Sequence, residues 1–239
     1  MADRIGQLVT LTAGERAALE ALDQRRREVP RHALMRAQRS ASDQMFILRA
    51  GSAICYVILR DGSRQIHRIH YPGDLIAAPS LSFNNSIETV VALTDVVVSS
   101  FDKAMLGNLF EAHPRLAALF FAIGQVERAA ITDRLTSIGR TTAEARVGAL
   151  LLDKLNRLRM IDPRVGSSFK LNITQEVMAD ATGLTSVHVN RMLRLLAERG
   201  YIQRIDGEVS ILDEDGLARL SNYENRYDDL DLSWLPPSR

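Results

Sequence analysis

The sequence is poor in residues and runs that several protein classes need. Its 239 residues include one cysteine, Cys55, so neither an intrachain disulfide nor a cysteine-ligated zinc or iron–sulfur site is available. The opening 22 residues lack the apolar core of about 7–15 residues that a secretory signal requires. No run approaches the ~20 apolar residues that cross a bilayer. We therefore expect a cytoplasmic chain that acts away from membranes.

Catalytic signatures are also missing. The sequence has no Ser/His/Asp, Cys/His or metal-ligand set at chemical spacing, and no glycine-rich phosphate loop. His67 and His70 are three residues apart in an expected strand, where alternate side chains point to opposite faces, so we interpret them as surface groups. The pattern makes an enzyme the weakest of the function classes, and it predicts no catalytic residue, metal or cofactor.

The composition that is present is typical of a well-packed globular chain. Apolar residues make up 46% and charged residues 25% of a sequence long enough for two domains. The net charge of +1 conceals a basic segment at 186–204. Its only acidic residue is Glu198, against the four arginines Arg191, Arg194, Arg199 and Arg204. One basic segment on a nearly neutral chain indicates a local anionic partner.

The first half of the chain has the texture of a β domain. Residues 12–22 predict a short helix capped by Thr12, with Glu15 at capping-box spacing. Apolar runs separated by turn signals, Asp61-Gly62 among them, then predict a small barrel or sandwich. The runs lie at 45–48, 53–59, 65–71, 89–93 and 96–101.

A long helix follows, within residues 103–138. It carries an apolar seam at the 3-4-3-4 spacing of a coiled coil, for which we predict pairing with a second copy of the chain. The predicted interface residues are Leu116, Leu119, Ile123, Val126 and Ala130. The alternative, a helix that packs only within its own chain, stays open at this point.

The last third contains a helix at 141–162 with a Thr141-Thr142 cap, and then a helix-turn-helix within 174–200. Ala179 fits the crossing of the two short helices, and Gly183 fits the turn between them. A hairpin at 201–212 predicts a wing. A last short helix is expected at 213–220, followed by a loosely held acidic tail.

The second short helix of this motif has an apolar stripe and a polar outer face. The stripe holds Val189, Met192, Leu193 and Leu196. Arginine donates two bonds to guanine, asparagine pairs with adenine, and valine contacts the thymine methyl, so the outer face suits the major groove of double-stranded DNA. The candidate DNA-binding residues are Thr185, Ser186, Val187, His188, Asn190, Arg191 and Arg194. A merely solvated helix leaves the turn, the crossing and the wing unexplained.

Residues 171–202 resemble the DNA-binding motif of the CRP/FNR family of bacterial transcription regulators. The segment LRAGSAICYVILRDGSRQIHRIHYPGDLI is similar to that family's cyclic-nucleotide-binding-like β-roll, and the helix at 115–138 to its dimerisation helix. The resemblance covers about residues 8–220. It implies a homodimer that binds a twofold symmetric operator, with half-sites about 34–36 Å apart, and that recruits or blocks RNA polymerase.

The resemblance also implies an α+β fold with four parts. They are an N-terminal β-roll (a cyclic-nucleotide-binding-like jelly roll, 1–108), a dimerisation helix (109–140), a winged helix-turn-helix (141–222) and an acidic tail (223–239). One departure lies in the recognition helix. Val187 stands where the best-known branches carry a glutamate, so we expect a different preferred base pair there.

A second departure lies in the effector region. The residues that the resemblance places there are Gly73, Asp74, Leu75, Ser86, Thr89 and Thr132. No lysine or arginine occurs between Arg68 and Lys103, and a buried phosphodiester without a cation keeps most of its desolvation penalty. Cyclic AMP is therefore disfavoured, although a cyclic-nucleotide-dependent regulator stays open as an alternative.

Other sensing chemistries of the family do not match either. The iron–sulfur branch needs four cysteines, and Ala77-Ala78-Pro79 stands where the haem branch has a histidine. Cys55 is interpreted as a small buried hydrophobe, with redox sensing as the alternative. Two pictures of regulation remain: an uncharged or weakly polar ligand, or DNA binding without an effector. A third alternative is a regulatory module whose helical pair binds protein.

Overall fold

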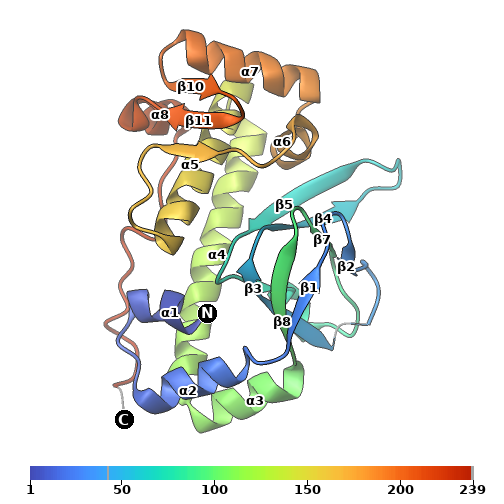
Figure 1. The fold of residues 1–239 in the computed structure, drawn as a ribbon, viewed down its shortest axis with the longest axis vertical. Coiled ribbons are helices and arrows are strands. Elements are labelled where there is room, and N and C mark those ends of the chain that lie inside the picture. Colours follow the sequence, from blue (N-terminus) through green and yellow to red (C-terminus); the bar gives the residue numbers. More distant parts are fainter. Residues whose placement is uncertain (42, 238–239) are drawn as a thin grey trace. The chain divides into compact units, whose positions relative to one another are not determined.

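The computed structural model describes residues 1–41 and 43–237, which fall into two compact units. The first contains Met1–Ser63, His67–Glu127 and Asp229–Arg239, and the second contains Arg64–Ile66 and Arg128–Asp228. Strands dominate the first unit and helices the second, as expected for the α+β class (Figure 1). The division falls inside one continuous helix, so the helix expected to be a separate part is shared between the units.

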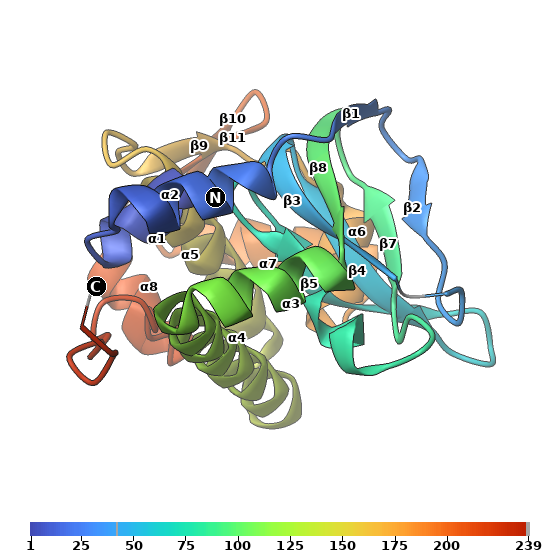
Figure 2. The same cartoon turned by 90° about the horizontal axis from the view of Figure 1, so that it is seen from below.

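Two four-stranded sheets form the β-roll. The first has the order β1-β8-β3-β6 and the second the order β2-β7-β4-β5. The neighbouring strands β1, β8 and β3 of the first sheet can be followed in Figure 2. The strands are β1 (Arg26–Val29), β2 (Leu34–Arg36), β3 (Gln44–Ala50), β4 (Ala53–Ile58), β5 (Arg64–His70), β6 (Leu75–Ile76), β7 (Thr89–Ala92) and β8 (Val96–Asp102). A 3-10 turn, Ala78–Ser82, joins β6 to the segment before β7.

Inward-facing residues of both sheets share one apolar core. Phe46 and Leu48 of β3 meet Cys55 of β4 and Val90 of β7 in this core, and all four are almost completely buried. The Asp61-Gly62 turn joins β4 to β5, with Gly62 in the left-handed region at φ +85°. The expected small β domain is therefore present. Its strands β3, β4, β5, β7 and β8 lie where the apolar runs predict them, whereas β1, β2 and β6 were not predicted.

Three helices cover one end of this unit. They are α1 (Ala2–Leu8), which the sequence did not predict, α2 (Ala13–Ala21) and α3 (Lys103–Ala112). The predicted capping box is confirmed: Thr12 Oγ1 accepts from the Glu15 N–H at 3.2 Å, and a Glu15 carboxylate oxygen accepts from the Thr12 N–H at 2.8 Å. Leu19 and Leu106 bury these helices against Met45 and Ile47 of β3.

The long helix α4 (Pro114–Arg140) begins after a break at His113, so the helical stretch from residue 103 is two helices. Leu116 and Leu119 are fully buried in the core that α4 shares with α1, α2 and α3. The prediction that these two residues form a dimer interface is therefore wrong, because the same chain already covers them. Ile123 packs against the same core.

The second unit is a winged helix-turn-helix. Its elements are α5 (Ala143–Ile161), β9 (Ser168–Lys170), α6 (Gln175–Thr182), α7 (Ser186–Glu198), β10 (Ile202–Ile205), β11 (Glu208–Ile211) and α8 (Glu214–Ser221). The predicted wing is confirmed, with Asp206 and Gly207 at φ +48° and +79° in its turn. β9 was not predicted and adds a third strand in the order β10-β11-β9.

The segment after α8 does not match the expectation of a loosely held tail. Tyr223 is largely buried and its hydroxyl accepts from the Asn156 side chain at 3.3 Å, which α5 presents. Further along, Leu232 and Leu235 pack against the apolar core around α1 and α2 in the first unit. Apolar side chains within the acidic tail therefore hold it, and its charge alone did not reveal this.

Candidate nucleic-acid interface

Short-range signals fix the two helices of the motif. Thr174 caps α6, and its side chain accepts from the Val177 N–H at 3.2 Å. Gly183 ends α6 in the left-handed region at φ +67°, where a side chain is strained. Thr185 then caps α7 by accepting from the His188 N–H at 3.2 Å. The turn glycine and the Thr185 cap are therefore where the sequence predicts them.

Helix α7 separates cleanly into a buried and an exposed face. Val189, Met192, Leu193 and Leu196 are buried in the second unit, as predicted. The side chain of Val187 is 82% exposed. The other candidates lie on the accessible part of the helix: Thr185, Arg191 and Arg194 are exposed, and Ser186, His188 and Asn190 are half-buried. The unit does not cover the face on which the DNA-binding hypothesis depends.

The charge of this surface comes from fewer arginines than the sequence count gives. Arg199 donates to the Glu144 carboxylate on α5 at 2.9 Å, so it ties the end of α7 to the helix behind it. Arg191 donates to His188 Nε2 at 2.9 Å on the exposed face. Arg194 and Arg204 remain exposed, and both line a groove beside the helix.

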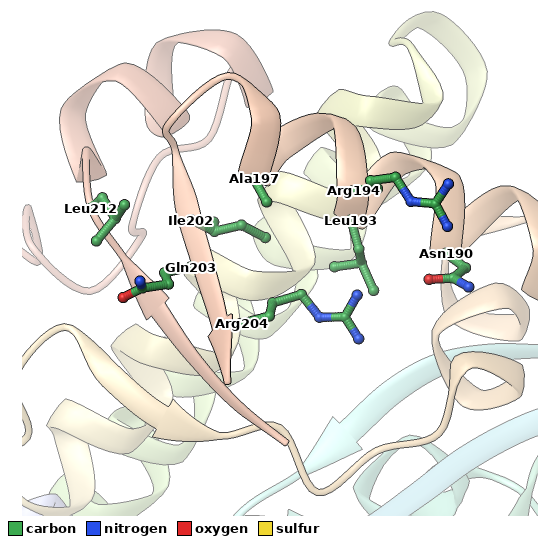
Figure 3. Close-up of a pocket in the computed structure, with 8 residues that line it drawn as sticks. All are labelled: Asn190, Leu193, Arg194, Ala197, Ile202, Gln203, Arg204 and Leu212. Carbon is green, nitrogen blue, oxygen red and sulfur yellow. The ribbon is translucent and has the colours of Figure 1, made fainter. Parts of the chain in front are cut away.

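That groove, of about 520 Å³, lies between α7 and the wing (Figure 3). The polar ends of Asn190, Arg194 and Arg204 turn toward the same end of it (Figure 3). Its eight lining residues include two arginines and no acidic residue. Arg204, on β10, is a functional candidate that sequence reasoning missed. Its place in the basic segment was the available signal, but only the register of the wing brings it beside α7.

In the predicted effector region, the Gly73-Asp74 pair is engaged by its own chain. Gly73 has φ +92°, and a Cβ there would lie 2.7 Å from Arg4 Cδ. The Arg4 guanidinium forms an ion pair with the buried Asp74 carboxylate, which also accepts from the Tyr71 N–H at 3.1 Å. Leu75, half-buried, starts β6. The pair therefore serves the local structure of the turn.

The hydroxyls proposed for the effector are engaged too. Ser86 donates to the Glu88 carbonyl at 2.7 Å, and Thr89 accepts from the Gln38 N–H at 3.1 Å. Thr132 lies in the second unit, where it is exposed and donates to the Arg128 carbonyl of its own helix. The structure thus places Ser86 and Thr89 in the β-roll and Thr132 in the second unit.

A buried carboxylate in this region was not foreseen. Glu88 is 2% exposed, and its Oε2 lies 2.7 Å from His67 Nε2. His70 is 8% exposed and lies beside Asp74, so its interpretation as a surface group is wrong. The two histidines do have different partners. Among residues 1–41 and 43–237, no group of three or more His, Cys, Asp or Glu side chains could hold a metal ion.

Cys55 lies completely buried in the core of the β-roll. Burial raises the pKa of its thiol well above the ordinary value, and the negative charge of Glu88 raises it further. Each unit of pKa above the solution pH lowers the reactive thiolate fraction about tenfold.

We therefore expect Cys55 in the native protein to react with a disulfide reagent more than about tenfold slower than a free solution thiol. Spectrophotometric thiol titration before and after denaturation checks this, because unfolding restores an ordinary exposed thiol. Rapid stoichiometric labelling of the native protein would restore redox sensing as an interpretation.

Helix α4 has exposed apolar residues on a different side from the predicted seam. Phe121, Ile131 and Leu135 are 61%, 47% and 71% exposed. At about 100° per residue, Gly124 and Gly139 lie on the same side of the helix, and a Cβ on either glycine would contact nothing. We name these five residues the outer face of α4. Val126 and Ala130 of the predicted seam are half-buried.

No helix within residues 1–41 and 43–237 has the length and apolar character to cross a membrane. The family model for a Crp-like helix-turn-helix domain matches residues 145–220, and that for a cyclic nucleotide-binding domain matches residues 26–113. Together they cover the second unit's DNA-binding motif and most of the β-roll.

Curated relatives and a solved structure agree with both matches. The chain is 31% identical to the nitrogen fixation regulation protein FixK of Bradyrhizobium diazoefficiens, over 66% of this chain and 65% of that protein, just under two thirds of its length. It is 29% identical to FixK of Rhizobium meliloti over 78% of this chain and 82% of the relative. The structure of FixK2 from Bradyrhizobium japonicum shares the fold at a TM-score of 0.74 and 22% identity, over 82% of this chain and 96% of that one. The chain belongs to the CRP/FNR family of DNA-binding transcription regulators.

Proposed function

We propose that this chain binds a twofold symmetric DNA operator as a homodimer, with α7 of each protomer in the major groove. One observation carries the proposal: the buried face of α7 holds the helix in the second unit and leaves the Val187, Asn190 and Arg191 side of it accessible. Base reading requires a helix that is held by its buried face and presents hydrogen-bond donors on its exposed face.

The candidate DNA-binding residues of α7 and the wing divide into those suited to read bases and those suited to bind the DNA backbone. Arg191 is suited to the two acceptors of guanine, Asn190 to adenine, and the exposed methyls of Val187 to thymine. Thr185 and Ser186 at the start of α7 are suited to phosphate oxygens. Arg194 and Arg204 flank a groove with no acidic lining residue, which favours a backbone phosphate beside the wing.

Dimer formation is assigned to the outer face of α4. Phe121, Ile131 and Leu135 expose apolar surface along one side of the helix, and Gly124 and Gly139 leave room for a partner backbone to approach. The same face of a second copy satisfies the isologous geometry of a twofold dimer. A twofold dimer presents two α7 helices to two half-sites, which accounts for a symmetric operator.

Selection of bound duplexes from random oligonucleotides, with and without cell extract, tests the proposal. We expect an inverted repeat whose half-site differs from TGTGA and TTGAT at the base pair that Val187 faces. Fluorescence anisotropy on the selected duplex should give an affinity that falls steeply with salt, since phosphate contacts release counterions. Absence of any enriched sequence, together with salt-independent binding, would favour the protein-binding module instead.

Two partners extend the proposal. RNA polymerase is the expected protein partner of a regulator bound beside a promoter, either recruited or blocked. For the β-roll, we favour an uncharged ligand or no effector over a phosphate ligand. The buried Glu88 carboxylate and the absence of lysine or arginine between Arg68 and Lys103 support this choice.

Cyclic AMP is accordingly expected to produce no saturable heat in calorimetric titration up to millimolar concentration. Between Arg68 and Lys103 the chain offers the phosphodiester of cyclic AMP no lysine or arginine, and the buried Glu88 carboxylate lies in that segment. The selected operator, titrated with and without the nucleotide, provides a second readout. Micromolar binding, or a nucleotide-dependent change in operator affinity, would make the chain a cyclic-nucleotide-dependent regulator.

A further inference from the structure

The guanidinium of Arg191 is held in place before any DNA is bound. It lies 2.9 Å from His188 Nε2, one helical turn earlier on the accessible face of α7. Because a guanidinium has donors and no acceptor, the ring nitrogen must accept with its lone pair. The imidazole is therefore neutral in this arrangement, with its proton on Nδ1.

Among the positions of α7 that neighbour Arg191 on the helix surface, only that of His188 offers an acceptor. Side chains three and four residues away are its neighbours on a helix surface. Those positions hold Val187 and His188 before it, and Arg194 and Leu195 after it. Two are aliphatic and one carries the same charge, which leaves the imidazole as the acceptor within reach.

The backbone under His188 is fixed as well. Its N–H donates to Thr185 Oγ1 at 3.2 Å, so the residue belongs to the capped first turn of α7. That turn follows directly from Gly183 and the end of α6. The backbone that carries the imidazole is therefore fixed, and the hydrogen bond from Arg191 to this ring restricts the conformations of the longer arginine side chain.

We propose that His188 is a positioning residue that holds the fork of Arg191 in the orientation for one base pair, and so sets the specificity of that contact. This inference rests on the proposed DNA-binding function. A neutral imidazole orders the arginine without neutralising it, so the full positive charge remains available to the base. Ordering a flexible side chain in advance removes part of the entropic cost of binding.

The test uses five full-length proteins: wild type, His188→Ala, His188→Gln, Arg191→Ala and the double variant His188→Ala/Arg191→Ala. Each is measured by fluorescence anisotropy, at one salt concentration, on the duplex selected with the wild type. A set of duplexes changed at single base pairs, and one unrelated duplex, complete the panel. Circular dichroism confirms that each variant is folded.

We expect His188→Ala to lower discrimination at the base pair read by Arg191 about three- to tenfold. Affinity for the unrelated duplex should change less than about twofold, because nonspecific binding depends on phosphate contacts. His188→Gln should restore discrimination, since its amide oxygen can accept from Arg191. In the Arg191→Ala background, His188→Ala should have no further effect at that base pair.

Two results would overturn the inference. Equal discrimination by wild type and His188→Ala would make the hydrogen bond incidental. A loss that persists in the Arg191→Ala background would make His188 a direct DNA contact. Both results require a wild type that prefers its selected operator. A wild type that prefers no sequence would overturn the proposed function itself, so the two failures are distinguishable.

Discussion

Replacing Arg191 with alanine is expected to abolish most of the preference for the selected operator. A bidentate arginine–guanine pair contributes about 1–3 kcal/mol of discrimination at each half-site. A twofold operator uses it twice, so the summed loss is about 2–6 kcal/mol if the half-sites are independent. Anisotropy titrations on the operator and on an unrelated duplex measure it, and binding to the unrelated duplex should be largely retained.

Arg204→Ala is the matched control, because it removes the same charge from the same unit. Arg204 lines the groove beside the wing, not the outer face of α7. Loss of a phosphate contact weakens binding to all sequences alike and lowers the salt slope by about one for each protomer, or about two for the dimer. If Arg191→Ala behaved in this uniform way, Arg191 would be a backbone contact and the base-reading role would pass to another residue.

Leu135→Glu is expected to convert the dimer into a monomer. The leucine is 71% exposed in the single chain, so the substitution leaves the fold of the protomer intact. In a twofold interface it places two carboxylates in apolar surroundings, and an uncompensated buried charge costs about 3–5 kcal/mol. The molar mass measured by light scattering should fall from twice 26.6 kDa to 26.6 kDa. The affinity for the operator should fall about 100-fold or more.

Leu34→Glu provides the control for the added charge. Leu34 is 60% exposed on β2 of the first unit, and it is not part of α4. This variant should remain dimeric and bind the operator like the wild type. A Leu135→Glu protein that stays dimeric at micromolar concentration would exclude the outer face of α4 as the interface.

Local signals account for the parts of the fold that the sequence predicted. The capping box at Thr12 and the left-handed Gly183 each act within five residues, so no knowledge of the rest of the chain is needed. The same holds for the Asp206-Gly207 turn of the wing. The outer face of α7 could also be predicted, because a 3.6-residue period assigns each side chain to one side of a helix.

Features that depend on distant residues escaped prediction. The pairing of Arg4 with Asp74 joins side chains 70 residues apart, and Glu88, just before β7, meets His67 of β5, 21 residues away. The seam of α4 failed for a related reason. Periodicity shows that Leu116 and Leu119 belong to an apolar side, but it does not show whether a partner or the same chain covers that side.

The C-terminal tail belongs to the first unit, whose N-terminal helices it helps to cover. The chain leaves the first unit at Glu127 and comes back to it at Asp229, where Leu232 and Leu235 join the apolar cluster under α1 and α2. The intervening hundred or so residues belong to the second unit, so a segment of the first unit lies on each side of them in the sequence. Removing the residues after α8 is therefore expected to expose apolar surface of α1 and α2, although some two hundred residues separate these helices from the tail in the sequence.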